Sequence, residues 1–508
     1  MTHLPALPIL IPLIAAALIL LVERRGLLPQ RIVAWSSMAA MLCIAAVLLR
    51  HADRGPLLVY LVGDWPARLG IALMVDRVTA LMLVTTALLA TASLLYAAAG
   101  WDRRALHFHA LFQLQLAGLN GAFLTGDLFN LFVFFEVLLI ASYGLMLSGG
   151  RGPRMRAGLH YVVFNILAST LFLIALGLLY GMTGTLNMAE MALRVAAASP
   201  QDLGLIRAAS GVLLVVFCAK AALLPLYLWL PDTYARAPAA VVALFTVMTK
   251  MGVYAVLRVY SLVFGQDAGE LAGWAWAWLL PVGVATLVIA SLGALGGRTL
   301  RGTVAYLVIA SAATLFVAFA LQTPEAIGAG LYYLVHSTFV TAALFLIVDL
   351  IRRQRGAASD RLQMAAPLGS TTLLGVMFVV AAVSVAGLPP LSGFIGKLAL
   401  LSSVPAAHTA LVWSSVLVTS LMILIALSRV GSQVFWRART YAPGETPTPP
   451  RTVEIAACML LLGFGVALTI AAGPALRYAN AAGEQLMAPA SYIEQVRTTV
   501  PLKRAPSP

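Results

Sequence analysis

The sequence predicts an all-α integral membrane protein, and three observations carry that prediction. Of its 508 residues, 61% are hydrophobic and 10% are charged, and the mean hydropathy is +0.94. Apolar runs of about 20 residues, long enough to cross a hydrocarbon core of about 30 Å, recur along the chain. No stretch resembles a soluble domain. Backbone groups in lipid must be satisfied without water, so these runs should form helices.

About fourteen such runs follow one another along the chain. The first lacks a basic start and a small-residue cleavage site, so we expect a retained helix there and not a removed signal peptide. The runs lie near 4–22, 31–50, 72–97, 107–125, 128–148, 158–181, 206–230, 238–262, 272–293, 302–321, 326–350, 371–403, 409–434 and 453–473.

The net charge of +14 would suit a nucleic-acid-binding protein, but the distribution of arginine argues against nucleic acid as a partner. Arginines gather in alternate loops, which is the positive-inside pattern. This pattern predicts a multi-pass protein of the cell (inner) membrane, with the arginine-rich loops in the cytoplasm and both termini outside. Those loops hold Arg24, Arg25, Arg31, Arg103, Arg104, Arg151, Arg154, Arg156, Arg236, Arg298, Arg301, Arg352, Arg353, Arg355, Arg361, Arg437, Arg439 and Arg451.

The chain carries none of the common motifs of metal or nucleotide chemistry. Cys43, Cys218 and Cys458 lie within predicted spans without metal-ligand spacing, and we expect them to be packing residues. There is no P-loop, no dinucleotide-binding glycine motif after a strand, no cysteine pair for an iron–sulfur cluster and no nucleophile elbow. We therefore expect no metal site, no cofactor and no enzymatic activity.

Two spans carry proline in their middle. Pro225 and Pro231 interrupt the span near 206–230, and Pro389 and Pro390 interrupt the span near 371–403. Proline removes a backbone donor and clashes with the preceding turn, so each helix should break there. Paired broken helices in two halves of a membrane protein indicate the binding region of an inverted-repeat transporter. The alternative is a pair of kinked helices without a functional role.

Three of the four lysines lie inside apolar runs, and the fourth, Lys503, lies in the polar tail. Lys220 and Lys397 belong to the two broken spans, whereas Lys250 lies at the centre of an unbroken one. Ionisable groups inside a membrane mark ion or proton pathways by default. Lysine can lose its proton when buried and arginine cannot, so the use of lysine at these positions favours proton transfer.

Glu136 lies about halfway along the span near 128–148 and is the natural partner for a buried lysine. A glutamate–lysine pair keeps both groups charged, whereas separating them favours neutral forms of both. A pair that opens is therefore a proton-transfer element, with Glu136 modulating Lys220. The alternative is a static ion pair that holds helices together.

Further ionisable groups extend this set. His336, in the span near 326–350, could relay a proton through its two ring nitrogens, or could be a packing histidine with hydrogen-bonded neighbours. Asp127 and Asp232 lie near span ends, where they could mark a pathway mouth or cap a helix. Arg258, near the end of its span, is expected to extend its guanidinium to the membrane surface.

Three motifs resemble one family of transporters. KAALLPLYLWLPDTYARAPAAVVALFTVMTKMGVYAVLRV is similar to the signature segment of the proton-translocating antiporter family. That family includes antiporter-like subunits of respiratory complex I and large subunits of Mrp-type cation/proton antiporters. TGDLFNLFVFFEVLLIASYGLMLSGG and GLPPLSGFIGKLALL resemble the D-type component of the Mrp (Mnh/Pha) antiporter more specifically. The resemblance covers roughly residues 5 to 475.

The resemblance implies fourteen helices with two inverted five-helix repeats, each containing a proline-broken helix. We accordingly expect N-terminal helices in 1–100, a first repeat in 105–265, a second in 270–436, a last helix in 450–475 and a polar tail in 476–508. By motif, the proton pathway of the family falls on Glu136, Lys220, Lys250, His336 and Lys397.

Two departures bear on this reading. Lysine at position 397, where complex I relatives often carry glutamate, favours the Mrp D type. Relatives often place a histidine near Ser311, and this chain does not, so the central relay would need Ser311 or water.

The function implied is exchange of Na⁺ or K⁺ for protons, performed with partner subunits of a membrane complex. One alternative is a proton-pumping membrane component of a complex I-like or hydrogenase redox complex. Another is a membrane scaffold without transport.

Overall fold

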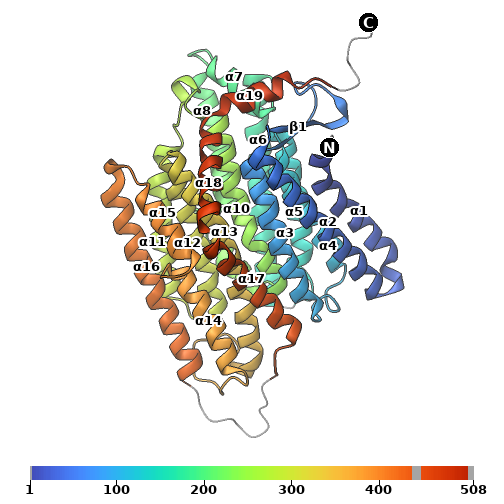
Figure 1. The fold of residues 1–508 in the computed structure, drawn as a ribbon, viewed down its shortest axis with the longest axis vertical. Helices are drawn as coiled ribbons and strands as arrows, with labels where there is room; N and C mark the ends of the chain where they lie inside the picture. The colour runs from blue at the N-terminus through green and yellow to red at the C-terminus, as the bar shows by residue number, and fades with distance from the viewer. Residues whose placement is uncertain (1–2, 151, 438–447, 502–508) are drawn as a thin grey trace.

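The computed structural model describes residues 3–150, 152–437 and 448–501, and this part is almost entirely helical (Figure 1). Arg151, Arg439 and Lys503 lie outside the described residues. Within that part, twelve helices are long and apolar enough to cross a membrane. The predicted all-α membrane fold is confirmed. The count of fourteen is not matched one for one, because α4 (Phe108–Leu124) and the pair α14 (Thr371–Ala386) and α15 (Ser392–Ser402) are shorter than the twelve.

The N-terminal part contains three α-helices and one small hairpin, at the right of Figure 1. One prediction fails here: the span expected near 72–97 starts too early, because its first apolar residues form a strand. Asp76 then starts the helix by accepting the backbone N–H of Thr79 at 2.8 Å. The elements are α1 (Leu7–Val22), α2 (Leu27–Arg54), β1 (Leu58–Leu61), β2 (Ala72–Val75), antiparallel to β1, and α3 (Arg77–Ala98).

Two sets of five passes follow, if each broken helix is counted as one pass. The first set is α4, α5 (Leu128–Leu147), α6 (Pro153–Thr183), the broken pair α8 (Leu203–Lys220) and α9 (Trp229–Arg236), and α10 (Ala239–Leu262), with the short α7 (Met188–Ala196) after α6. The second set is α11 (Trp276–Leu295), α12 (Leu300–Ala320), α13 (Pro324–Gln354), the broken pair α14 and α15, and α16 (Thr409–Gly431).

The two sets match in order and in packing. In each, the first helix packs against the second, and the third packs against the broken one. The third helices, α6 and α13, both have 31 residues. Because five passes separate the start of one set from the start of the other, the two sets run through the membrane in opposite directions. α10 and α13 lie in the middle of the molecule, and α16 lies at one edge (Figure 1).

The C-terminal segment differs from the expected polar tail. After α17 (Thr452–Ile470), the chain forms α18 (Ala472–Met487) and α19 (Pro489–Thr498). α18 packs along α13 because small residues allow a close approach: a Cβ on Gly483 would lie 2.3 Å from the carbonyl oxygen of Pro324. α19 lies over α7, at the end of the molecule where the first described residues also lie (Figure 1).

The prediction that Arg258 reaches the membrane surface is also wrong. Its side chain is buried, with 4% of the residue exposed, and it donates hydrogen bonds to both carboxylate oxygens of Asp76. The pair joins α10 to the start of α3. Arg258 also donates to Thr79 Oγ1 at 3.2 Å. This buried ion pair therefore holds the end of α10 to the start of α3 and is not a solvated charge.

Candidate functional site

The first broken helix positions Lys220 at the end of α8. The chain leaves the helix through Ala222, whose φ of +58° lies in the left-handed region, and resumes at Trp229. Nearby side chains satisfy backbone groups freed by the break. Leu224 N–H donates to Thr286 Oγ1 of α11 at 3.0 Å, and Trp229 Nε1–H donates to the Ala219 carbonyl at 3.0 Å. The predicted break is thus stabilised partly by the second repeat.

Lys220 and Glu136 do not form the direct pair expected from the sequence. Lys220 Nζ donates to Asn165 Oδ1 at 3.2 Å and to Ser169 Oγ at 3.4 Å, both on α6. The Ser169 hydroxyl in turn donates to Glu136 Oε1. Ser169 therefore bridges the two charges. Phe135 lies beside them, with its ring centroid 5.9 Å from Lys220 Nζ.

Lys250 lies at the middle of α10 and is fully buried. Among the described residues its ammonium has one hydrogen-bond partner, Ser311 Oγ of α12, at 2.6 Å. Two residues farther along α10, Gly252 lies against the end of α8. A Cβ there would be 2.6 Å from Ala221 N and 2.9 Å from the carbonyl carbon of Lys220. The absence of a side chain at Gly252 therefore brings α8 and α10 together beside both lysines.

His336 lies on α13 and is 1% exposed. Its Nδ1 lies 2.9 Å from Ser392 Oγ, at the start of α15, and its Nε2 is buried without a partner in the described part of the chain. Gly393 makes this approach possible, since a Cβ on it would lie 2.9 Å from His336 Nε2 and 1.9 Å from the Ser384 carbonyl oxygen. The second break thus places α15 directly against the histidine.

Lys397 lies on α15, just past the second break, as the sequence predicts. Its ammonium donates to the carbonyl of Ala386, the last residue of α14, at 2.9 Å and to the carbonyl of Val385 at 3.3 Å. It also donates to Ser420 Oγ of α16 at 2.8 Å. Carbonyls freed by the break therefore hold this cation, which has no carboxylate partner among the described residues.

A small cavity joins the groups of the second half. Ser311, His336, Lys397 and Ser420 line it, and its volume is about 10 Å³. A cavity of this size is close to the minimum that holds one water molecule. The cavity connects the partner of Lys250 to Lys397. His336, whose Nε2 has no partner among the described residues, is one of the residues that line it.

The two aspartates expected at pathway mouths lie apart from this chain of groups. Asp127 caps α5, with its carboxylate accepting the backbone N–H of Asn130 at 2.8 Å. Burial raises the pKa of Asp127 to about 6. Asp232 is half exposed and pairs with Arg236 at 2.7 Å on α9. Asp127 thus caps a helix, one of the two alternatives named above, and Asp232 forms an ion pair within α9; a role at a pathway mouth stays a prediction for both.

Sequence reasoning misses the neutral partners of the site. Asn165, Ser169 and Ser420 each accept a hydrogen bond from a lysine, yet none of them is among the residues predicted from the sequence. Asn165 could have been found, because an amide in the middle of an apolar span requires a hydrogen-bond partner. The serines carry no such signal, since serine can satisfy its hydroxyl on its own helix. Within the described ranges, no group of three His, Cys, Asp or Glu side chains is placed to hold a metal ion.

The buried lysines, the two broken helices and the repeat are the features that the resemblance described above implies. The profile described as "NADH:quinone oxidoreductase/Mrp antiporter, TM" matches residues 125–423, which is more than half of the chain. The chain belongs to this family. The match begins just before α5 and ends within α16, so it includes all five proposed pathway residues of this antiporter-family chain.

Curated relatives of this family member match it over nearly its whole length. The D component of a probable K⁺/H⁺ antiporter of Rhizobium meliloti is 40% identical, with 97% of each chain covered. The D component of a Na⁺/H⁺ antiporter of Bacillus subtilis is 36% identical, covering 98% of this chain and 99% of the relative. A chain in the structure of the Mrp complex from Dietzia superposes with a TM-score of 0.88 at 29% identity, covering 98% of this chain and all of that one.

Proposed function

We propose that this chain is the D-type component of a multisubunit antiporter that exchanges a monovalent cation, Na⁺ or K⁺, for protons. The observation that carries the proposal is the set of hydrogen-bond partners of the three buried lysines. Each donates to neutral oxygens, and none lies in a direct ion pair within the described residues. No carboxylate fixes their charge, so each can both take up and release a proton.

The proposed pathway runs along the middle of the membrane through both repeats. It begins with Glu136 and Lys220, which communicate through Ser169, and continues to Lys250 on α10. From there it passes Ser311, crosses the small cavity to His336 and ends at Lys397. In this scheme Glu136 modulates Lys220, Lys250 passes protons between the repeats, and Lys397 exchanges them with the aqueous exit.

The same proposal includes the partner subunits and the orientation in the membrane. The relatives are named as antiporter subunits, and the superposed chain belongs to an Mrp complex, so we infer that this chain works with other antiporter subunits in the cell membrane. The first described residues and α19 lie at one end of the molecule, opposite the arginine-rich loops (Figure 1). We assign the arginine-rich end to the cytoplasm and both termini to the outside.

The test is cation-dependent collapse of a pH gradient in vesicles that hold the whole complex, with Na⁺ and K⁺ added separately. Lys220→Ala and Glu136→Ala should each abolish the collapse while the complex still assembles. Arg298→Gln, in an exposed loop outside the pathway, is the matched control and should keep the wild-type rate. Wild-type antiport in both pathway variants would rule the proposal out.

A second candidate function follows from the breadth of the family, whose description includes NADH:quinone oxidoreductase. In that case the same buried charges would pump protons for a redox complex. Co-purification decides between the two: flavin and iron–sulfur subunits favour the redox complex, and small membrane subunits alone favour the antiporter.

A further inference from the structure

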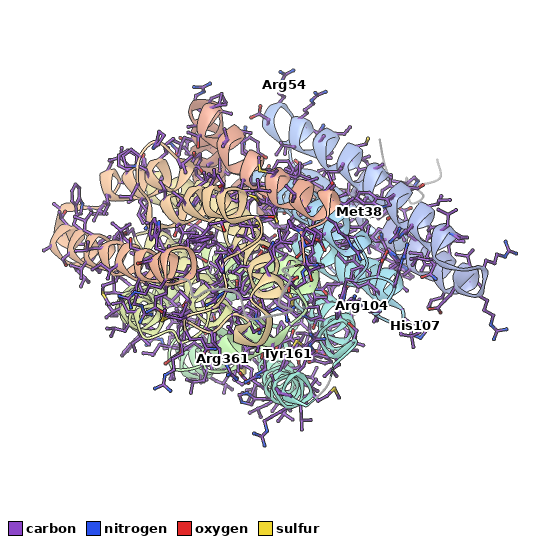
Figure 2. All side chains as sticks on the ribbon, turned by 90° about the horizontal axis from the view of Figure 1, so that it is seen from below. Met38, Arg54, Arg104, His107, Tyr161 and Arg361 are labelled. Atoms are coloured by element: carbon purple, nitrogen blue, oxygen red, sulfur yellow. The ribbon has the colours of Figure 1, made fainter. Side chains whose placement is uncertain are left out.

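A basic cavity lies at the arginine-rich end of the molecule, apart from the lysine pathway. Its volume is about 120 Å³, and it is enclosed by the end of α3 and the loop after it, the starts of α6, α10, α12 and α17, and the end of α13. Figure 2 views the molecule from this end, with Arg104 labelled. Six arginines line the cavity: Arg104, Arg154, Arg301, Arg352, Arg353 and Arg451.

Carboxylates neutralise three of these six arginines. Arg352 pairs with Asp349 at 2.6 Å, and Arg353 pairs with Glu454 at 2.8 Å. Asp349 and Glu454 are the acidic residues of the lining. Arg301 pairs at 2.8 Å with Asp360, in the loop after α13. These pairs join α12, α13 and α17 into one wall.

The other three arginines have no carboxylate partner among the described residues. Arg154 donates to the backbone carbonyls of Ser148 and Arg236 and lies over the ring of Trp101, 5.4 Å from its centroid. The guanidinium groups of Arg104 and Arg451 donate no hydrogen bond to any of the described residues. Arg451 Nη1 is close to the loop after α3, since a Cβ on Gly100 would lie 2.6 Å from it.

Two further donors face the same space. The cavity includes Pro238 and Ala239, where α10 begins without any side chain capping its first turn. The free N–H groups of a helix start carry a partial positive charge and favour anions. Trp101 also lines the cavity, and its buried Nε1–H has no acceptor in the described residues.

We propose that this cavity binds a phosphate group. Three guanidinium groups without a carboxylate partner, an uncapped helix start and an unpartnered indole N–H supply donors to it, although Arg154 also donates to two backbone carbonyls. Guanidinium forks bind phosphate oxygens in pairs, which makes arginine a residue of choice for this anion. By the measure used for the small cavity above, this volume is well over the about 10–15 Å³ that holds one water molecule. That is room for one phosphate group, carried either by an anionic phospholipid or by free inorganic phosphate.

The location gives such binding a structural consequence. The helices that enclose the cavity also carry parts of the lysine pathway: Ser169 on α6, Lys250 on α10 and His336 on α13. A bound phosphate would hold the ends of these helices together. The inference does not depend on the proposed antiport, because its test measures binding alone.

The test uses the purified complex in detergent and native mass spectrometry. Wild type is compared with Arg104→Gln/Arg451→Gln and with the control Arg298→Gln, which removes an exposed arginine outside the cavity. Phosphatidylglycerol and phosphatidylcholine are added in separate samples. A second measurement follows the melting temperature of each complex as inorganic phosphate is titrated against chloride.

If a phospholipid is the ligand, the double variant retains one phosphatidylglycerol fewer per complex than wild type and the control, and phosphatidylcholine retention is unchanged. If free phosphate is the ligand, phosphate raises the melting temperature of wild type and the control but not of the double variant. Equal lipid retention together with equal phosphate response in all three complexes overturns the proposal. Should the double variant fail to assemble, Arg104→Gln alone serves, because its side chain is exposed and has no partner to lose among the described residues.

Discussion

Lys250 donates a hydrogen bond of 2.6 Å to the hydroxyl of Ser311. Ser311 donates in turn to the carbonyl of Val308, on its own helix, and also lines the cavity that His336 and Lys397 share. The contact therefore joins the central lysine to the second repeat. In the proposed pathway, the Ser311 hydroxyl takes the place of the histidine that several relatives carry near this position, and this role stays a prediction.

Replacing Ser311 tests that link. Ser311→Ala leaves the buried ammonium of Lys250 without its partner, and a hydrogen bond to a charged group contributes about 1.5–3 kcal/mol. We expect the antiport rate to fall by about tenfold or more. Ser311→Thr keeps a hydroxyl and should keep most of the rate. The measurement is the initial rate of gradient collapse in vesicles, and equal rates for Ala, Thr and wild type would refute the link.

Ser169 should couple Glu136 to Lys220. Since the serine hydroxyl contacts both, Ser169→Ala should lower antiport in the same direction as Glu136→Gln. The two changes break one connection, so their effects should be far from additive. A double-mutant cycle of antiport rates measures this. If the fold reduction in rate of the double variant equals the product of the fold reductions of the two single variants, Glu136 acts on Lys220 by another route.

The contact between α8 and α10 predicts a stability effect at Gly252. A methyl group at this position would overlap the backbone of Ala221, and overpacking typically costs about 1–3 kcal/mol. Gly252→Ala should therefore lower the melting temperature of the complex. Gly177→Ala, within α6, meets nothing within 4 Å and is the control. A melting temperature for Gly252→Ala as high as that of the control would contradict the contact.

Asp127 predicts a pH dependence of stability. Burial raises its pKa to about 6, above the value of about 3.9 for an exposed aspartate. The folded state then binds more protons than the unfolded state between about pH 4 and 6, so this residue lowers the free energy of unfolding as pH rises through that window.

Asp127→Asn keeps an N-cap side chain and removes the titration. At pH 7–8 the free energy of unfolding of the variant should exceed that of wild type by at most about 3 kcal/mol, so the variant should melt at a higher temperature. This difference should shrink below about pH 5. Thermal melts of both complexes across this range provide the measurement. A difference that is constant with pH would show that Asp127 does not titrate in this window.

The charged members of the site can be located from the sequence because each contradicts its apolar surroundings. Lys220, Lys250, His336 and Lys397 stand out on that ground, and the prolines predict both breaks. Their partners cannot be found in the same way. Ser169 and Ser420 are ordinary residues of membrane helices, and only tertiary packing brings them to a lysine.

Elements of the fold escape prediction for comparable reasons. The sequence-based prediction places β2 within a membrane span, because four apolar residues do not reveal whether they form a strand or a helix. The same prediction places most of α18 in a polar tail, although its alanine and glycine residues let this helix pack closely on α13. The direct Glu136–Lys220 pair is expected from charge alone, and the intervening serine depends on how α6 lies between α5 and α8.

The central claim is that the buried lysines act by releasing and taking up protons. Lys250→Arg tests it most directly, because arginine keeps the positive charge and the ability to donate to Ser311 but cannot lose its proton. The measurement is cation-dependent collapse of a pH gradient in vesicles that hold the assembled variant complex. Assembly should be retained, and the rate should fall below about a tenth of the wild-type rate. An assembled Lys250→Arg complex with the wild-type rate would contradict it.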